Sequence, residues 1–457
     1  MDAPKYHLTT YGCQMNKSDS ERIASLLQSL GFTQTENEAE AGLILLNTCS
    51  VRQSAEDRVY GQVRAFERLK AAKPGLIIGL TGCMAGRDRD GKIRKKLPIV
   101  DFCFPITDLP QLPRWIQELR PDLISQETLA PASYLQIDPI RTHTRQAFVV
   151  VQTGCNKFCS YCVVPFGRGQ EKNRPAKEIL DEVRGLVAGG AVEITLLGQS
   201  VNSYCAPDPE AFSAGNPYKD HYAALLWELN QIEGLKRLHF TAAYPTHMTD
   251  EVIDALALRA QVNFLHLAVQ SGDDEVLRRM NRRYGCAEYM DIIRRVRAKH
   301  PAMAIGTDII VGFAGETEEQ FERTISLYEE IRFDISYNAI YSPRTGTAAW
   351  RAFKDDVPRE EKRRRWNRLQ EVMERVVREK NQAYLEKEVS VLVERCGPVV
   401  QPSAGPAGRP AMTLMCSGNS REMKLVTFPG TQELVGQIVS VRITKPETWI
   451  LYGEHIA

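Results

Sequence analysis

The segment Cys155-Asn-Lys-Phe-Cys159-Ser-Tyr-Cys162 places three cysteines within eight residues, directly after a strand-like run at 148–152. Thiolates are soft ligands that select iron–sulfur clusters, zinc or copper(I). A structural zinc site normally takes four protein ligands, and this loop offers three. A four-iron cluster held by three cysteines keeps one iron free to bind a substrate or cofactor. The spacing therefore favours a cluster over the two alternatives, which are zinc with a distant fourth ligand and three coincidental buried cysteines.

The cysteine loop opens a long alternation of strands and helices. Strand-like runs lie at 148–152, 193–197, 237–241, 264–268, 304–311 and 335–341, with helical patterns between them. Six consecutive βα units in one domain predict an open or partial (β/α) barrel. Barrel enzymes carry their sites at the carboxyl ends of the strands, so we expect the cysteines at the mouth of this barrel. A charged helix is expected to follow over 354–387, with its apolar residues on one face.

Residues 1 to about 125 alternate in the same way, with strand-like runs at 6–11, 42–47, 76–80 and 100–104. This pattern predicts an α/β domain with a parallel sheet and helices on both faces. Cys13, Cys49 and Cys83 each follow one of the first three strands. Because carboxyl ends of parallel strands share one edge, the three thiolates could meet at one point. From the residues alone, a shared metal site and three structural cysteines both stay open. Cys103 is expected to be buried packing.

The other segments complete a three-domain α/β organisation. Residues 126–146 have no clear period and are expected to link domain 1–125 to the barrel domain 147–387. From 388 to 457 apolar residues alternate with period two, which predicts a small β-barrel. Within it, 397–411 is rich in glycine and proline and is expected to be a flexible loop.

Composition narrows the class of protein. The chain has 457 residues, with 58 Lys+Arg against 57 Asp+Glu, so any nucleic-acid site must be a local basic patch. No apolar run reaches the roughly 18 residues of a membrane span, and the first residues lack the apolar core of a secretory signal. We therefore expect a cytoplasmic protein with no membrane contact. Its eleven cysteines are an odd number and favour metal ligands or catalytic groups over disulfides.

The cysteine loop after the first barrel strand resembles that of the radical S-adenosylmethionine (SAM) enzymes. The C-terminal barrel resembles the RNA-binding TRAM domain. The order of the two cysteine sets and this barrel resembles the methylthiotransferase branch of these enzymes, and the resemblance covers essentially the whole chain. Further segments carry the resemblance to a tRNA-modifying member, at 162–165, 167–169, 197–204, 269–272, 307–313 and 341–344. Three positions depart from the usual pattern: Ala268 stands for proline, Tyr244 for histidine and Ser200 for asparagine.

The resemblance implies a reaction. Cys155, Cys159 and Cys162 would hold a 4Fe–4S cluster that binds SAM and cleaves it to methionine and a 5′-deoxyadenosyl radical. Cys13, Cys49 and Cys83 would hold a second 4Fe–4S cluster carrying the sulfur to be inserted. The product would be a methylthio group on C2 of N6-isopentenyl (dimethylallyl) adenosine next to a tRNA anticodon, with electrons from a flavodoxin-type or ferredoxin-type protein.

Three alternatives stay open. Two are methylthiotransferases, one acting on threonylcarbamoyl-adenosine in tRNA and the other on a ribosomal-protein aspartate. The third, from another class, is a non-catalytic RNA-binding protein whose cysteines hold structural zinc.

Other residues are weaker candidates. Phe158 and Tyr161 could cover the cluster or adenine, although packing is the simpler explanation. Gln199 and Gln270 end barrel strands and could contact SAM or substrate. The resemblance implies that the strand with Asp308 and Ile310 passes beside the adenine and ribose of SAM. The best local RNA contacts in the C-terminal barrel are Arg421, Lys424 and Phe428, whereas the basic run from Lys362 is at least as well explained as a salt-bridged helix.

Overall fold

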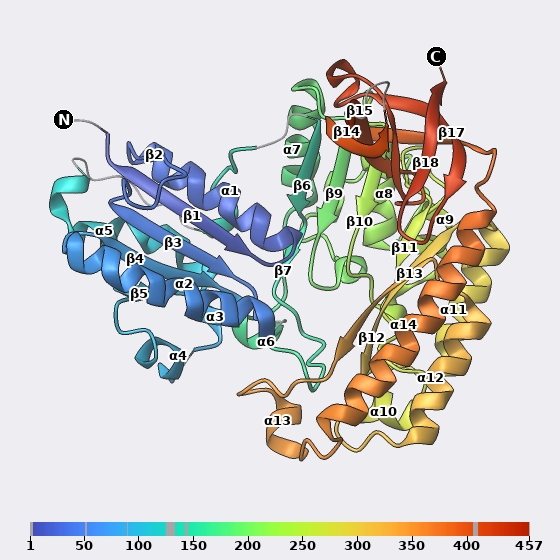
Figure 1. Ribbon diagram of the computed structural model, residues 1–457, viewed down its shortest axis with the longest axis horizontal. Coiled ribbons are helices and arrows are strands. Elements are labelled where there is room, and N and C mark those ends of the chain that lie inside the picture. Colours follow the sequence, from blue (N-terminus) through green and yellow to red (C-terminus); the bar gives the residue numbers. More distant parts are fainter. Residues whose placement is uncertain are drawn as a thin grey trace.

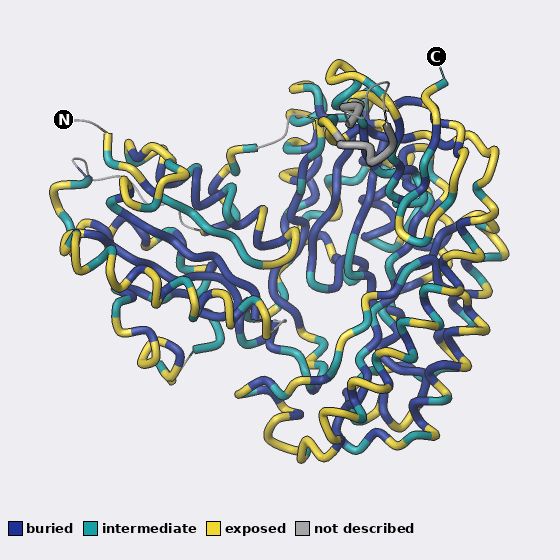
Figure 2. The backbone as a smooth tube through the Cα atoms, in the orientation of Figure 1, coloured by how far each residue is buried: buried dark blue, intermediate teal, exposed yellow. Residues whose placement is uncertain are grey.

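The structure is a computed structural model that describes residues 3–50, 53–88, 90–124, 133–141, 145–404 and 410–456. Three domains follow one another along the chain, with the N-terminal domain beside the central barrel and the C-terminal barrel above it in Figure 1. Figure 2 shows most strands of the first two domains buried and the outer faces of their helices exposed. No described helix is long and apolar enough to cross a membrane.

The N-terminal domain is a parallel sheet in the order β2 (Thr33–Gln34), β1 (Lys5–Tyr11), β3 (Leu43–Thr48), β4 (Ile77–Gly82) and β5 (Phe102–Cys103). Apolar side chains on one face pack against α1 (Gln14–Ser29) and α5 (Leu112–Leu119). Those on the other face pack against α2 (Gln53–Ala72) and α4 (Lys92–Lys95), with α3 (Cys83–Gly86) directly after β4. This architecture confirms the predicted parallel sheet with helices on both faces.

The central domain has all six predicted strands, β6 (Gln146–Val150), β9 (Glu193–Leu197), β10 (Arg237–Phe240), β11 (Phe264–His266), β12 (Ala304–Val311) and β13 (Ile335–Ile340). They form two three-stranded parallel sheets, and a bridge between Ala243 and Leu267 joins the sheets. Among the described residues no pairing closes β13 onto β6, so the barrel is open as predicted. The short strands β7 (Gln152–Thr153) and β8 (Lys172–Asn173) pair beside it.

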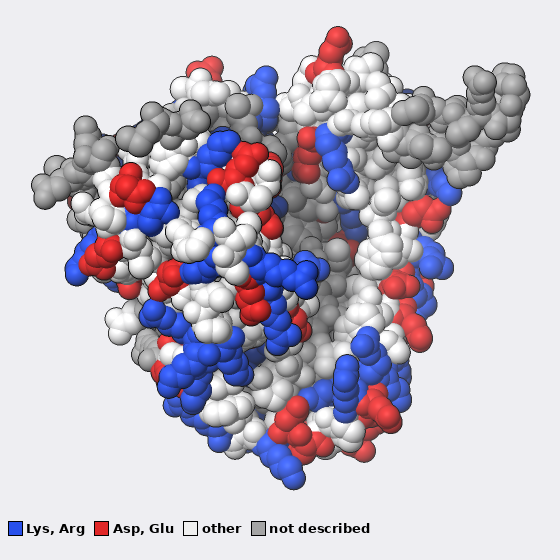
Figure 3. Space-filling view, turned by 60° about the vertical axis from the view of Figure 1, so that its left-hand side comes forward, with Lys and Arg blue, Asp and Glu red and all other residues white. Residues whose placement is uncertain are grey.

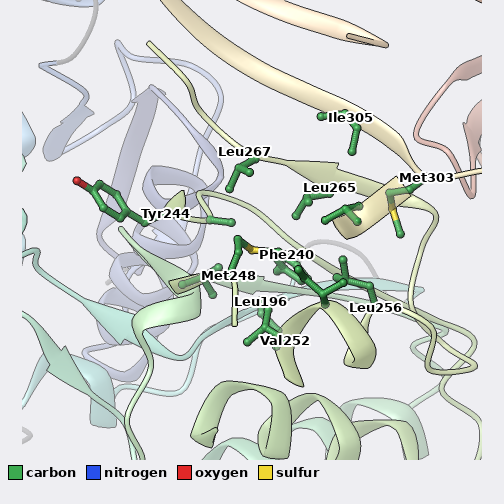
Figure 4. Close-up of a cluster of buried hydrophobic side chains, with 14 of the residues drawn as sticks. Leu196, Phe240, Tyr244, Met248, Val252, Leu256, Leu265, Leu267, Met303 and Ile305 are labelled. Atoms are coloured by element: carbon green, nitrogen blue, oxygen red, sulfur yellow. The ribbon is translucent and has the colours of Figure 1, made fainter. Parts of the chain in front are cut away.

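Helices cover the outer face of the barrel. Their apolar residues share one core with every second strand residue, and Figure 4 shows part of this cluster between β9, β10, β11 and β12. The covering helices are α7 (Ala176–Ala188), α8 (His221–Asn230), α9 (Asp250–Ala255), α11 (Cys286–Lys299), α12 (Glu318–Ile331) and α14 (Arg359–Gln382). Three shorter helices, α6 (Val164–Gly167), α10 (Asp274–Arg279) and α13 (Ala348–Ala352), lie near the strand ends. The alternate strand residues therefore face the barrel interior.

The basic run on α14 is a salt-bridged helix. Arg364, Arg365 and Arg368 pair with glutamates of α12 or with residues next to it, and Arg365 also pairs with Glu361. Because these cations already have carboxylate partners, they join two helices and leave little positive charge for a phosphate.

The C-terminal domain is a closed antiparallel barrel with one parallel pair, β14 (Glu388–Ala404), β15 (Pro410–Ser420), β16 (Leu425–Pro429), β18 (Leu451–Ile456) and β17 (Ile438–Pro446) in spatial order. The expected loop at 397–411 is wrong for 397–404, which continue β14 against β15, and for 410–411, which begin β15; residues 405–409 lie outside the described residues. Past Leu392 the opposite edge of β14 pairs with no described strand residue. An unpaired edge tolerates proline, which explains why Pro398 does not end the strand.

The C-terminal barrel closes the amino end of the central barrel. Arg237 of β10 donates to the carbonyls of Asn419 and Ser420, both at 2.8 Å, and its Nε lies 2.7 Å from Glu193. Met423 packs with Phe264 and its apolar neighbours at the same end. The end opposite the cysteine loop is thereby filled.

This contact corrects the expected RNA-binding residues. Arg421 donates to the carbonyls of Arg259 and Gln261, and Lys424 is buried and paired with Asp334. Phe428 lies in the core of the C-terminal barrel. Their side chains hold the two domains or the small barrel together, so the expected RNA contacts of the buried Lys424 and Phe428 are wrong, and that of Arg421 stays a prediction.

Arg237→Met should destabilise the protein strongly. Arg237 and Glu193 are buried, with side-chain exposures of 2% and 6%, and removing one partner of a buried pair costs about 3–5 kcal/mol because the other charge stays uncompensated. The double variant Arg237→Met/Glu193→Leu should recover part of that loss. Urea unfolding measures the free energy of unfolding of both variants. The control is the exposed Arg278→Gln, whose free energy of unfolding should lie within about 1 kcal/mol of the parent's. An unchanged urea midpoint for Arg237→Met would contradict this assignment.

Candidate functional site at the facing strand ends

The three N-terminal cysteines lie at one edge of the sheet, where their strands end. Cys13 caps α1 after β1, Cys49 follows β3, and Cys83 opens α3 after β4. Two buried asparagines hold the first two loops together, because Asn16 donates to the side chain of Asn47 at 3.1 Å and Asn47 donates back to the carbonyl of Asn16 at 2.8 Å. The edge position that the topology predicted for these cysteines is present.

Two glycines make this edge compact. Gly12 has a φ of 154°, and a Cβ on it would lie 3.0 Å from the Cβ of Cys49. Gly82 has a φ of 89°, and a Cβ there would lie 2.6 Å from Oδ1 of Asn47. A side chain at either position would push the cysteine loops apart.

The barrel cysteines lie in an irregular loop after β7. This loop is fixed at its centre, where Ser160 donates through its backbone to Met280 at 2.9 Å and through its hydroxyl to Arg279 at 2.7 Å. Each thiol receives one N–H donor: Cys155 from the backbone of Lys157, Cys159 from Arg282 at 3.3 Å, and Cys162 from the backbone of Val164 at 3.4 Å. Donors aimed at sulfur stabilise the thiolate form that metals require.

The two cysteine sets face each other. A Cβ on Gly86 of α3 would overlap the backbone of Gly167 in α6, and a Cβ on Gly167 would lie 2.9 Å from the carbonyl of Cys83. Burial raises the pKa of the Cys162 thiol, and the thiols of Cys159, Cys155 and Cys83 raise it further. Figure 1 shows the carboxyl ends of β1, β3 and β4 turned toward the barrel at this point.

A buried ion pair fastens the domains beside this contact. Arg168 of the barrel domain lies 2.6 Å from Asp19 of α1, with side-chain exposures of 1% and 0%. Tyr134 donates to the same carboxylate at 3.1 Å, so the described part of the expected linker packs on the N-terminal domain. Burial raises the pKa of the Cys83 thiol, and a hydrogen bond from Arg168 opposes that shift. Sequence patterns gave no signal for Arg168 in this position.

The donor chemistry of the two cysteine sets, three thiols each, is compatible with iron–sulfur clusters. Among the described residues, no three His, Cys, Asp or Glu side chains converge as one metal ion needs. A zinc ion requires its thiolates about 2.3 Å from one point, whereas a four-iron cluster takes each thiolate on a different iron. Burial raises the pKa of Cys83, Cys155 and Cys162. Thiols that hold their protons without metal give them up when metal binds.

The barrel interior beside the cysteine loop is polar on β11 and β12. Asp308 lies 2.8 Å from Nε2 of His266 on the adjacent strand, and the ring of Tyr337 lies 5.7 Å from the His266 ring. Ile310 points the same way, one alternation further along β12. Sequence reasoning missed His266 and Tyr337, although period-two alternation puts both on the face of Asp308.

Gln270 is the most constrained of the other candidates. It has a φ of 73°, its N–H donates to Asp308 and its carbonyl accepts from Ile310. Its buried Oε1 has no hydrogen-bond partner among the described residues, which suits a site completed by a ligand. Gln199 lies half-buried just after β9.

The two aromatic residues of the cysteine loop are separated by the fold. Tyr161 packs against an apolar cluster that includes Phe313 and Tyr341, which supports the packing explanation for its ring. Phe158 has a φ of 50° and is 51% exposed.

A cleft of about 650 Å³ opens between the domains next to the cysteine sets. Val163, directly after Cys162, forms part of its wall. The cleft is lined by basic residues of both domains: Arg87, Lys92, Lys95, Lys96, Arg344 and Arg351. Figure 3 shows Lys and Arg gathering over the lower part of the face turned forward.

Comparisons with known proteins agree with this geometry. The Radical SAM superfamily model matches residues 149–328, and UPF0004, described as an uncharacterized protein family, matches residues 5–105. TsrM from Kitasatospora setae, a radical SAM methyltransferase with cobalamin and a [4Fe-4S] cluster bound, aligns with a TM-score of 0.53 and 13% identity over 76% of this chain and 77% of that chain, which shows the fold alone. Fold and site together define a radical SAM enzyme.

Two curated relatives identify the family within the radical SAM enzymes. The tRNA-2-methylthio-N(6)-dimethylallyladenosine synthases of Moorella thermoacetica and Clostridium botulinum are each 39% identical to this chain. The alignments cover 99% of this chain in both cases and 98% and 97% of the relatives. The chain belongs to this family of methylthiotransferases.

Gly86→Ala should loosen the contact between the domains. The new Cβ would overlap the Gly167 backbone, which cannot rotate away as a side chain could. We expect Cys83, which is 3% exposed, to react faster with iodoacetamide in the cluster-free protein. Peptide mass spectrometry measures the rate. The control is Gly61→Ala on α2, where a Cβ meets nothing within 4 Å. Equal Cys83 rates in both variants would show that the glycine contact does not set the docking.

Proposed function

We propose that this enzyme inserts a methylthio group at C2 of N6-isopentenyl (dimethylallyl) adenosine next to a tRNA anticodon. The observation that carries the proposal is the placement of two sets of three cysteines, from two domains, at facing strand ends. Near-full-length similarity to relatives named for that modification supports the substrate. Nucleoside mass spectrometry of tRNA from cells lacking the protein tests it, since loss of that one nucleoside is expected. Loss of a threonylcarbamoyl derivative instead would favour the first alternative.

Cys155, Cys159 and Cys162 would hold the cluster that binds SAM. When bound, that cluster supplies the electron for cleavage of SAM, taken from a flavodoxin-type or ferredoxin-type donor. The barrel residues then hold and orient the cofactor. Asp308 offers a carboxylate already oriented by His266, and Gln270 offers its unpartnered Oε1. Ile310 gives an apolar surface beside them, and Gln199 lies at the same ends of the strands.

Cys13, Cys49 and Cys83 would hold a second 4Fe–4S cluster that carries the sulfur. This assignment is supported by the burial of Cys49 and Cys83 and by the close approach of Gly167, five residues after Cys162, to the carbonyl of Cys83. The two clusters would then share one space between the domains. An unactivated aromatic C–H bond requires a radical, while the sulfur requires a separate donor, so adjacent sites suit the reaction.

The cleft between the domains suits an RNA strand. Each of its acidic residues is already engaged: Glu56 by Arg87, Asp88 by backbone N–H groups of α4, and Asp90 by Lys92. Lys95, Lys96 and Arg351 pair with no described residue. Tyr60 and Phe166 line the same cleft and offer rings for base stacking. Positive charge combined with aromatic rings is how proteins bind single-stranded nucleic acid. A role for residues 388–457 in RNA binding stays a prediction.

Changing each cysteine set to alanine should separate two steps. The Cys155/Cys159/Cys162 variant should lose reductive cleavage of SAM, because the iron that binds SAM is lost. The Cys13/Cys49/Cys83 variant should retain cleavage but make no methylthio product. Each should bind about half the iron of the parent chain. Chromatography of cleaved SAM and mass spectrometry of tRNA measure the two steps. Methylthio product from the N-terminal variant would refute its role as sulfur donor.

Removing the unpaired cations of the cleft should weaken tRNA binding and its salt dependence. Each phosphate contact contributes about 0.7 to the slope of log affinity against log salt for single strands, so Lys95→Ala/Lys96→Ala/Arg351→Ala should lower the slope by about 2. The control removes three exposed arginines that do not line the cleft, Arg184, Arg278 and Arg294. Fluorescence anisotropy with an anticodon stem-loop measures both. Equal slopes for the two triple variants would place the RNA elsewhere.

A further inference from the structure

Arg282 lies between α10 and α11 and reaches back to the cysteine loop. Its Nη1 donates to Sγ of Cys159 at 3.3 Å, across 123 residues of sequence. The same guanidinium donates from Nη2 to the carbonyl of Ala268 at 3.0 Å and from Nε to the hydroxyl of Tyr284 at 2.7 Å. All three of its nitrogens therefore have fixed partners, so the guanidinium has little freedom to turn away from Cys159.

Two aromatic rings hold the guanidinium on its faces. Its central carbon lies 4.5 Å from the ring centre of Tyr244 and 5.0 Å from that of Tyr284, within range of a cation–π interaction. Figure 4 shows the Tyr244 side chain pointing away from the apolar cluster, with its hydroxyl far from the other labelled residues. That hydroxyl accepts from the backbone of Arg283 at 3.3 Å, which fixes the ring.

The charge of Arg282 has no carboxylate partner among the described residues. Its neighbours are a main-chain carbonyl, a phenol, two aromatic faces and the Cys159 sulfur. A half-buried cation normally pairs with an anion. Of these described contacts, the Cys159 sulfur is the one that carries negative charge as a metal ligand.

We propose that Arg282 is a positioning residue that sets the reduction potential of the barrel cluster through its charged hydrogen bond to Cys159, with Tyr244 holding the guanidinium in place. The inference rests on the proposed function, because it takes Cys159 as a ligand of that cluster. Reduction adds one negative charge to the cluster, and a nearby cation stabilises the reduced state more than the oxidised one. The arginine therefore makes the electron easier to accept.

Arg282→Gln should make the cluster harder to reduce, because glutamine keeps a donor but loses the charge. The test uses the reconstituted full chain with Cys13, Cys49 and Cys83 changed to alanine, so that only the barrel cluster contributes. We expect the equilibrium constant for reduction to fall about tenfold, which is about 59 mV for one electron. Arg282→Lys keeps the charge but not the planar fork and should shift the potential less. A redox titration monitored by electron paramagnetic resonance measures the reduction potential of each variant. The iron content is determined on each sample.

Matched variants separate this role from a structural one. Arg278→Gln removes an exposed arginine of α10, four residues before Arg282, and its potential should equal the parent's. Tyr244→Phe keeps the aromatic face but loses the hydrogen bond from Arg283, so it should lower the potential less than Tyr244→Leu does. If Arg282→Gln cannot retain iron, Arg282→Lys and Tyr244→Leu carry the test.

Two outcomes would overturn the inference in distinguishable ways. Iron-loaded Arg282 variants with an unmoved potential overturn this inference alone, and weaker SAM binding in those variants would show that the guanidinium serves SAM instead. A parent chain that takes up no iron would overturn the proposed function and this inference with it.

Discussion

The structure depends on one close contact, the approach of α3 to α6 through Gly86 and Gly167. Neither residue has a side chain, so the two backbones touch, and the domains that carry them dock at this point. The Arg168–Asp19 pair lies beside the contact and is fully buried. Taking two such charges out of water costs several kcal/mol per ion, so the pair favours the docked state only because its geometry is good and Tyr134 also donates to Asp19. Docking brings Gly167, five residues after Cys162, against Cys83, and the candidate site lies where the domains meet.

The C-terminal barrel contributes to the site from the opposite end. By filling the amino end of the central barrel, it covers apolar residues such as Phe264 and gives Arg237 carbonyl partners. Chemistry is thereby directed to the carboxyl ends of the strands, where the cysteine loops lie. A domain that resembles an RNA-binding module is also part of the barrel's core packing, so removing it would expose buried charges as well as any RNA contact.

Much of this arrangement could be predicted from sequence because it is local. Each barrel strand is a short apolar run between turn signals, so its position was predicted to within a few residues. The cysteines at strand ends followed from parallel topology. The contacts that shape the site are not local: Arg282 reaches Cys159 across 123 residues and Arg168 reaches Asp19 across 149, and no period or spacing encodes either. Charge was a poor guide for the same reason. From the sequence, Lys424 was expected to be a surface cation, whereas in the fold it pairs with Asp334, 90 residues away.

The structure also changes the interpretation of the departures from the usual methylthiotransferase pattern. From the sequence alone, Tyr244 and Ala268 suggest altered substrate contacts. In the structure, both contact the guanidinium of Arg282. They do not act equally. Ala268 contributes its main-chain carbonyl, and a proline at that position would contribute the same acceptor. Tyr244 contributes its ring, and tyrosine presents a neutral aromatic face over the whole physiological pH range, whereas a histidine there could take up a proton and repel the arginine. Of the two departures, only Tyr244 therefore changes the electrostatic environment of the Cys159 sulfur, and it does so by keeping an uncharged surface against a cation that has no acidic partner among the described residues.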